Sequence, residues 1–138
     1  MQGYNCIMVY DQERKHLLFC KRIKDPYKGL YNFVGGKIEP GEEGVEAAYR
    51  ELDEETGITR GQIKLHHMMD FTYYNQGCYV EVYVGQLERE VILQEELHPL
   101  HWIDVRENFF DMSRFAGEGN IGHMLEQVKQ FGFGTVGT

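Results

Sequence analysis

The stretch that decides the fold runs from Gly36 to Ile58 and reads GKIEPGEEGVEAAYRELDEETGI. It begins with a glycine turn and a loop that carries Glu39-Pro40-Gly41, a turn signal. Glu42 and Glu43 follow at the predicted helix start, where acidic side chains suit the positive end of the helix dipole. Gly57 lies where a residue that tolerates a left-handed conformation usually ends a helix. The stretch therefore predicts a loop that runs into a helix of about three turns.

One face of this predicted helix is apolar. At about 100° per residue, one arc, which we expect to face the core, contains Val45, Ala48, Tyr49 and Leu52. Glu46 and Asp53 lie roughly opposite that arc, where solvated acids are expected.

Three further acids, Glu51, Glu54 and Glu55, border the apolar arc instead of opposing it. Like charges at i,i+3 and i,i+4 cost roughly 0.2–0.5 kcal/mol per pair, so their grouping favours a bound cation that neutralises them. Arg50 can pair with Glu46 and Glu54 at i,i+4 and hold the group in place. Carboxylate oxygens favour a hard ion, Mg²⁺ or Mn²⁺, over zinc. For a Glu-rich helix taken alone, the alternative is a solvated acidic face.

The loop and the helix together follow a fixed pattern: Gly, five residues, Glu, seven residues, then Arg-Glu-aliphatic-any-Glu-Glu-any-Gly-aliphatic. Its defined positions are filled by Gly36, Glu42, Arg50, Glu51, Leu52, Glu54, Glu55, Gly57 and Ile58. This pattern is the Nudix box, and the chain resembles a Nudix hydrolase over essentially its whole length. The resemblance implies an α/β fold, the α/β/α sandwich with a mixed β-sheet that carries the box as a loop and helix.

The resemblance also implies hydrolysis of a nucleoside diphosphate linked to another group X, by attack of a metal-activated water on a phosphoanhydride. The metal ligands that it implies are the Gly36 carbonyl, Glu42, Glu51, Glu54 and Glu55, with Mg²⁺ expected and Mn²⁺ as an alternative. Glu42 is either a ligand through water or the partner that orients Arg50. Arg50 itself is expected to be structural more than a substrate contact.

The general base is expected in the loop before the last strand, as in MutT-like relatives. Glu96 is the first candidate and Glu95 the second, and a merely solvated acidic loop is the alternative. His98 lies in the same loop, but a single loop histidine predicts no role. We assign none to His66 or His67.

Substrate contacts are predicted at both ends of the site. Arg22 aligns with a basic residue that MutT-like relatives use against phosphate, and Lys37 directly follows the box glycine. Asn32 and Phe33 belong to an aromatic-Asn-aromatic element that faces the purine in these relatives, although strand alternation would send the two to opposite faces. Trp102 is expected to stack on the base or else to join the core.

The stretch 115–120 is a predicted loop at the pocket mouth, where Glu118 or Asn120 reads the base. Together these features resemble MutT-like enzymes that convert an oxidised purine nucleoside triphosphate such as 8-oxo-dGTP to monophosphate and pyrophosphate. The alternatives are a dinucleoside polyphosphate hydrolase, towards which Tyr74 points, an ADP-ribose hydrolase, and a Nudix ligand sensor without catalysis.

Length and composition bound the remaining choices. A chain of 138 residues predicts a single domain over 1–138, and its formal charge of −8 argues against nucleic acid as a partner. Cys6, Cys20 and Cys78 form no metal or disulfide pattern, which predicts reduced thiols and a cytoplasmic location. No signal peptide or membrane span is expected, and the protein is predicted to act on a small nucleotide as a monomer or homodimer.

The remaining elements are predicted from periodicity. Two hairpins are expected, one from strands 4–10 and 16–22 and one from strands 63–74 and 79–87. Short strands are expected over 31–34 and 100–103, and a closing helix over 121–131, followed by a loose tail over 132–138.

Overall fold

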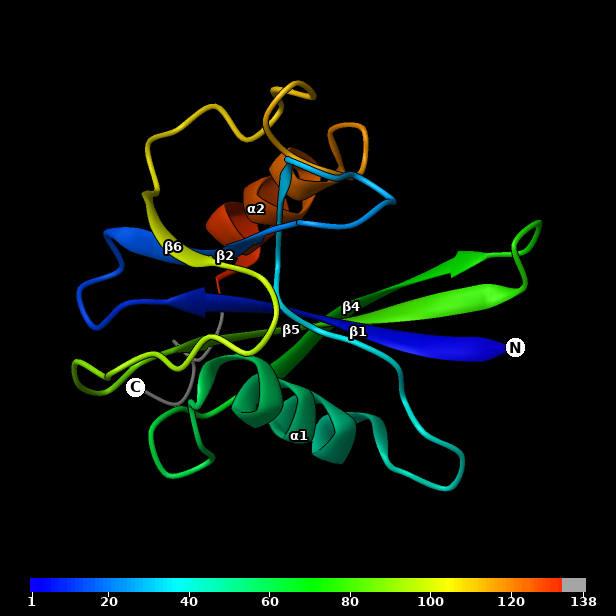
Figure 1. Cartoon of the computed structure of the whole chain (residues 1–138), viewed down its shortest axis with the longest axis horizontal. Coiled ribbons are helices and arrows are strands. Elements are labelled where there is room, and N and C mark those ends of the chain that lie inside the picture. The colour runs from blue at the N-terminus through cyan, green and yellow to red at the C-terminus, as the bar shows by residue number, and fades with distance from the viewer. Residues whose placement is uncertain (133–138) are drawn as a thin grey trace.

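The computed structural model describes residues 1–132, which form two helices and a mixed sheet (Figure 1). In chain order the elements are β1 (Gln2–Tyr10), β2 (His16–Lys21), β3 (Tyr31–Asn32), α1 (Gly44–Thr56), β4 (His66–Tyr73), β5 (Cys78–Gln86), β6 (Leu100–Asp104) and α2 (Asn120–Phe131). All predicted elements are present with small shifts of their ends. The tail expected over 132–138 lies outside the described residues after Gly132.

The sheet has six strands in the order β3-β2-β1-β5-β4, with β6 paired to β2. β1 and β5 are parallel, and the other pairs are antiparallel. Figure 1 shows α1 and α2 on opposite sides of the sheet. The predicted α/β/α sandwich with a mixed sheet is therefore confirmed.

Each helix covers its own hydrophobic core, because alternate side chains of the strands point to opposite faces. On β1, Met8 packs in the cluster that contains Met124 of α2, whereas Ile7 and Val9 pack in the cluster that contains Leu52 of α1. The sheet thus has a hydrophobic core on each face, and the segment after β3 forms bridges to β1, between Val34 and Ile7 and between Lys37 and Tyr4.

Both predicted hairpins are confirmed, with shifts of one to three residues at several strand ends. β1 pairs with β2, and the Asp11 carboxylate holds the turn by accepting the N–H groups of Lys15 and His16 at 2.8 and 3.2 Å. β4 pairs with β5 but begins only at His66, since Ile63 forms an isolated bridge with Leu87.

α1 begins at Gly44 and ends at Thr56. The predicted end is confirmed: Gly57 has φ 78° and its N–H donates to the Asp53 carbonyl at 2.8 Å. Ala48 and Leu52 are fully buried as expected, and Ala47 is buried beside them. Among residues 1–132, neither helix is long and apolar enough to cross a membrane.

Candidate active site

Gly36 is the residue at which the glycine turn packs against α1, beside Glu51. A Cβ at this position would collide with the Glu51 carboxylate, so glycine lets that carboxylate keep its position. Asn5 of β1 holds the same residue twice: the Asn5 N–H donates to the Gly36 carbonyl at 2.8 Å, and the Gly36 N–H donates to Asn5 Oδ1 at 2.9 Å. The turn is thereby fixed against both the sheet and the helix.

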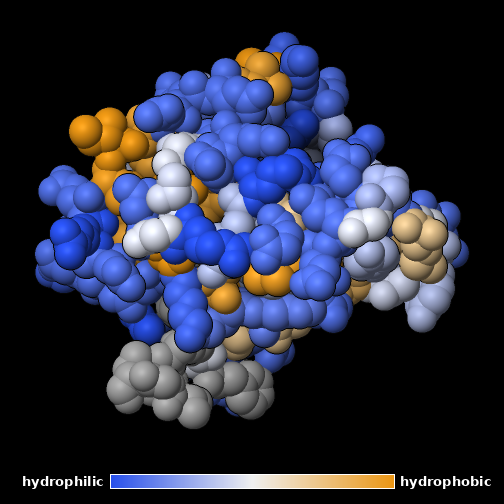
Figure 2. All heavy atoms as spheres, turned by 90° about the horizontal axis from the view of Figure 1, so that it is seen from below, coloured by the Kyte–Doolittle hydropathy of each residue, from blue (hydrophilic) through white to orange (hydrophobic). Residues whose placement is uncertain are grey.

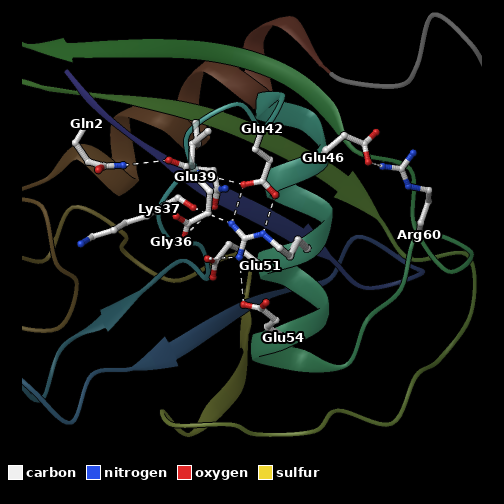
Figure 3. Close-up of polar contacts among 12 residues, drawn as sticks. Gln2, Gly36, Lys37, Glu39, Glu42, Glu46, Glu51, Glu54 and Arg60 are labelled. Atoms are coloured by element: carbon white, nitrogen blue, oxygen red, sulfur yellow. Dashed lines mark hydrogen bonds and ion pairs between the residues drawn. The ribbon is translucent and has the colours of Figure 1, made fainter.

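Arg50 forms ion pairs with Glu42, Glu51 and Glu54, the three glutamates that Figure 3 labels beside one another along α1. Its Nε and Nη2 donate to the two Glu42 oxygens at 2.7 and 2.9 Å, and Nη2 also donates to the Lys37 carbonyl at 3.0 Å. Its Nη1 reaches Glu51 at 3.0 Å and Glu54 at 3.3 Å. The guanidinium therefore ties the box loop to the helix, as expected of a structural arginine.

The predicted pair between Arg50 and Glu46 is wrong. Glu46 instead accepts from Arg60 Nη2 at 2.6 Å, on the far side of α1. The reason is that Glu42 and the Lys37 carbonyl already engage Nε and Nη2 of Arg50. Glu42 makes the contact with Arg50 that the second of its two predicted roles requires.

Two of the box glutamates, Glu51 and Glu55, are partly shielded from solvent. Burial raises the pKa of Glu55 to about 7, although the Gly35 N–H donates to its carboxylate at 3.3 Å. Burial also raises the pKa of Glu51, even with Arg50 beside it. Glu54 is more open, with its side chain 54% exposed. Arg50 offsets only part of the negative charge of four neighbouring carboxylates.

This arrangement fits a hard divalent cation. Ionised Glu51 and Glu55 are disfavoured by desolvation, and a cation would stabilise their charged forms. The donor atoms are carboxylate oxygens and the Gly36 carbonyl, whose second lone pair is not used by Asn5. Oxygen donors of this kind suit Mg²⁺ or Mn²⁺.

A cavity of about 560 Å³ connects this acidic group to the other predicted contacts. Its lining includes Arg22, Asn32, Phe33, Lys37, Glu55 and Glu118. Asn32 and Phe33 both line it because β3 ends at Asn32, so the alternation that would separate them does not continue. Another cavity, of about 610 Å³ beside α2, is lined by none of the predicted site residues.

Trp102 is the predicted contact that lies elsewhere. It sits on β6 and packs against the core cluster on the α1 side, and it is absent from the described lining of the 560 Å³ cavity. Its alternative interpretation as a core residue agrees with this position. Tyr74 is 81% exposed and is also absent from the described lining of that cavity, whereas its neighbour Tyr73 lines it.

The mouth of the cavity is bridged by a hydrogen bond between two loops. The Tyr27 hydroxyl donates to the Glu118 carboxylate at 3.0 Å, and both residues line the cavity. Asn120 reaches the Tyr73 hydroxyl at 3.3 Å on the same side. At the inner end, Asn32 Oδ1 accepts the Phe33 N–H at 2.9 Å, which fixes the orientation of the Asn32 amide.

The two candidates for the general base differ in position. Glu96 and Glu55 line the same small cavity of about 90 Å³, and the charge of Glu96 contributes to the raised pKa of Glu55 after the larger effect of burial. Glu95 accepts the Leu100 N–H at 2.8 Å, which is a structural contact at the start of β6. The geometry favours Glu96.

His98, to which the sequence assigned no role, also lies at this site. It lines both the 560 Å³ and the 90 Å³ cavity, its Nδ1 accepts the Ile23 N–H at 3.1 Å, and burial lowers its pKa.

A second group without a predicted role lies on β4 and β5. Potential ligand atoms of His67, Asp70 and Glu81 lie there within 4.8 Å of one another. A register shift between His67 and Met69 gives this group its arrangement, and no sequence period reveals such a shift.

Comparison with known proteins gives the same family. The NUDIX domain matches residues 2–125. CTP pyrophosphohydrolase of Escherichia coli K12 is 36% identical over 64 residues, a match that covers 45% of this chain and about half, 47%, of that relative.

Two solved structures have the same fold along most of their length. Ap4A hydrolase of C. elegans superimposes with a TM-score of 0.72 at 21% identity, covering 95% of this chain and 98% of that one. A MutT structure from work on Aliivibrio salmonicida and Vibrio cholerae gives 0.71 at 19% identity, covering 94% and 98%. With its box complete and the domain matched over residues 2–125, the chain belongs to the Nudix family.

Proposed function

We propose that this protein is a divalent-metal-dependent hydrolase that splits a phosphoanhydride bond in a nucleotide. The observation that carries the proposal is the position of Glu55. The charge of Glu51 acts on the Glu55 carboxylate, which joins Glu55 to the acidic group, and Glu55 also lines the 560 Å³ cavity that contains Arg22, Asn32 and Lys37. A cation held by that group would therefore lie beside the phosphates of a nucleotide in the cavity.

The cation would be held by Glu51, Glu54 and Glu55 with the Gly36 carbonyl. When bound, it supplies charge neutralisation for the polyphosphate and lowers the pKa of water. Arg50 keeps the glutamates in register with the loop. Arg22 and Lys37 bring positive charge to the cavity wall, which a protein of net charge −8 needs in order to bind a polyanion.

Proton transfer is assigned to Glu96. Glu96 and Glu55 line the same small cavity, so a water bound beside Glu55 would lie close to the Glu96 carboxylate. His98 is held neutral, because its Nδ1 accepts a backbone N–H and its pKa is lowered by burial. Because Nδ1 accepts the Ile23 N–H, the neutral ring carries its own proton on Nε2 and has no free lone pair to take a proton from water, so Glu96 is the candidate base of this loop.

The residues expected to contact the nucleobase favour a purine nucleoside triphosphate such as 8-oxo-dGTP as substrate, with monophosphate and pyrophosphate as products. Asn32 offers a donor and an acceptor to a base edge, and Phe33 offers an apolar wall. Glu118, held by Tyr27, provides a second polar group at the mouth. This MutT-like activity would serve to clear damaged nucleotides from the pool of a cell's cytoplasm.

A dinucleoside polyphosphate or ADP-ribose is the alternative substrate. Tyr73 and Tyr27 line the cavity and offer aromatic surface for a second nucleoside. Tyr74, which pointed to this class in the sequence, is exposed and does not support it. A ligand sensor without catalysis is disfavoured, because the acidic group is complete and tied together by Arg50.

The test is a release assay for phosphate and pyrophosphate in Mg²⁺. The panel contains 8-oxo-dGTP, dGTP, dATP, CTP, ADP-ribose and diadenosine tetraphosphate, with Glu54→Gln as the blank. We expect the highest turnover with an oxidised purine triphosphate, with pyrophosphate released. Turnover of ADP-ribose or the dinucleotide alone would overturn the substrate, and no Glu54-dependent turnover of any compound would overturn the function.

A further inference from the structure

Asn5 is the residue of β1 that holds the box glycine at both of its polar groups. Its backbone N–H donates to the Gly36 carbonyl at 2.8 Å, and its side-chain Oδ1 accepts the Gly36 N–H at 2.9 Å. An amide nitrogen could not accept that N–H, so the orientation of the Asn5 side chain is fixed. Nδ2 must occupy the other branch of the amide.

That nitrogen has no partner. Asn5 is 5% exposed, and within residues 1–132 no acceptor lies in hydrogen-bond distance of its buried Nδ2. A buried amide that lacks an acceptor destabilises a fold, so an apolar side chain would suit packing better at this position. Stability alone therefore does not explain an asparagine at this position. The hydrogen bond that Asn5 makes to Gly36 points to a functional reason for it.

Gly36 stands between Asn5 and the acidic group. On one side it is bonded to Asn5, and on the other its Cα is so close to Glu51 that a Cβ would collide with the carboxylate. A movement of Gly36 would therefore change both the direction of its carbonyl and the space left for Glu51. Outer contacts of this kind orient metal ligands and tune the affinity of the site.

We propose that Asn5 is a positioning residue for the cation site: its amide oxygen holds Gly36 so that the Gly36 carbonyl and the Glu51 carboxylate face one cation. This inference rests on the proposed function, since it assumes that the acidic group binds a divalent ion. Asn5 also lines the 560 Å³ cavity, but its positioning role acts through its hydrogen bond to Gly36.

Gln2 provides a matched control. It lies on the same strand, and its Nε2 donates to the Ile38 carbonyl at 3.2 Å, two residues further along the same loop. Gln2→Ala removes a contact between β1 and the box loop without touching Gly36. A role of Asn5 that merely fastens the loop would be shared by Gln2, whereas a role in orienting Gly36 would not.

The experiment is a calorimetric titration of the ion-free protein with Mn²⁺, together with thermal unfolding in EDTA. We expect Asn5→Ala to weaken Mn²⁺ binding about ten-fold, as loss of an outer contact typically does, and Gln2→Ala to bind like the wild type. Asn5→Leu, which keeps the branched shape of the side chain and removes the unpaired amide nitrogen, should weaken Mn²⁺ equally while unfolding in EDTA at or above the wild-type temperature.

Wild-type Mn²⁺ affinity in folded Asn5→Ala or Asn5→Leu would overturn the inference, as would equal weakening in Gln2→Ala. These outcomes differ from a failure of the proposed function. If the wild type binds Mn²⁺ in an Asn5-dependent way but hydrolyses no nucleotide of the panel, the hydrolase proposal fails and the role of Asn5 stands. If the wild type binds no Mn²⁺, both fail.

Discussion

The Glu42 carboxylate and the Arg50 guanidinium form a two-point ion pair, with N···O distances of 2.7 and 2.9 Å. Glu42 belongs to the loop before α1, and Arg50 lies in the middle of the helix. The planar fork of an arginine makes two parallel bonds that a lysine cannot reproduce. The pair therefore sets where the box loop sits relative to the helix, and with it the distance between Gly36 and the glutamates.

Arg50→Lys is expected to reduce Mg²⁺-dependent turnover by about ten-fold or more, because the outer partner of several metal ligands is lost. The control is Arg60→Lys, since Arg60 pairs with Glu46 on the solvent side of the same helix. Steady-state kinetics at several Mg²⁺ concentrations check this. Equal activity of the two variants would contradict a role for the Glu42–Arg50 pair.

Glu55 should make stability depend on pH when no cation is bound. Burial raises its pKa from 4.5 to about 7, so folding favours the neutral acid. This contribution is fully present below pH 4.5 and is lost as the pH rises through about 7. Thermal unfolding in EDTA should therefore show Glu55→Gln gaining stability over the wild type at pH 8 but not at pH 4.5. A constant difference across that range would refute the raised pKa.

Glu96 and Glu95 are neighbours with different expected roles. Glu96→Gln should lower kcat on the order of a hundred-fold, as loss of a general base does, and should flatten the acidic limb of the pH–rate profile. Glu95→Gln keeps an oxygen that can accept the Leu100 N–H, so its kcat should be close to that of the wild type. The reverse ranking of the two variants would transfer the role to Glu95.

Asn32 should decide which base is accepted, and Trp102 should not. Asn32→Ala is expected to lower kcat/KM for the preferred purine by about ten-fold or more, because each hydrogen bond to the base edge contributes roughly 0.5–1.5 kcal/mol. Trp102→Phe should leave the ratio of kcat/KM between purine and pyrimidine triphosphates unchanged, since Trp102 packs on the α1 side. A shift of that ratio in Trp102→Phe, with none in Asn32→Ala, would exchange the two assignments.

Much of the fold follows from local signals in the sequence. Strand alternation, the turn residues around Gly77 and the left-handed position of Gly57 are properties of short segments, and the corresponding elements lie where they are predicted. The box also gathers its own site, because Gly36 and the glutamates lie on one loop and one helix.

Contacts between distant segments cannot be predicted from such local signals. The pair of Glu46 with Arg60 depends on how the chain turns after α1, and the place of Trp102 depends on which face of β6 meets α1. The buried amide of Asn5 and the ring of His98 enter the site only through the sheet order and the loop before β6. None of these positions is marked by a periodicity or a motif.

The most direct test of the central claim compares Mg²⁺-dependent pyrophosphate release by the wild type, Glu55→Gln and Asp53→Asn. Asp53 is an exposed acid on the same helix and serves as the matched control. The account predicts that removing Mg²⁺ with EDTA, or changing Glu55, lowers turnover on the order of a thousand-fold, whereas Asp53→Asn retains it. Figure 2 shows a largely hydrophilic surface on the α1 side. Loss of a single acidic side chain that does not bind the cation should therefore have little effect on turnover. Turnover that survives EDTA, or that falls equally in both variants, would contradict it.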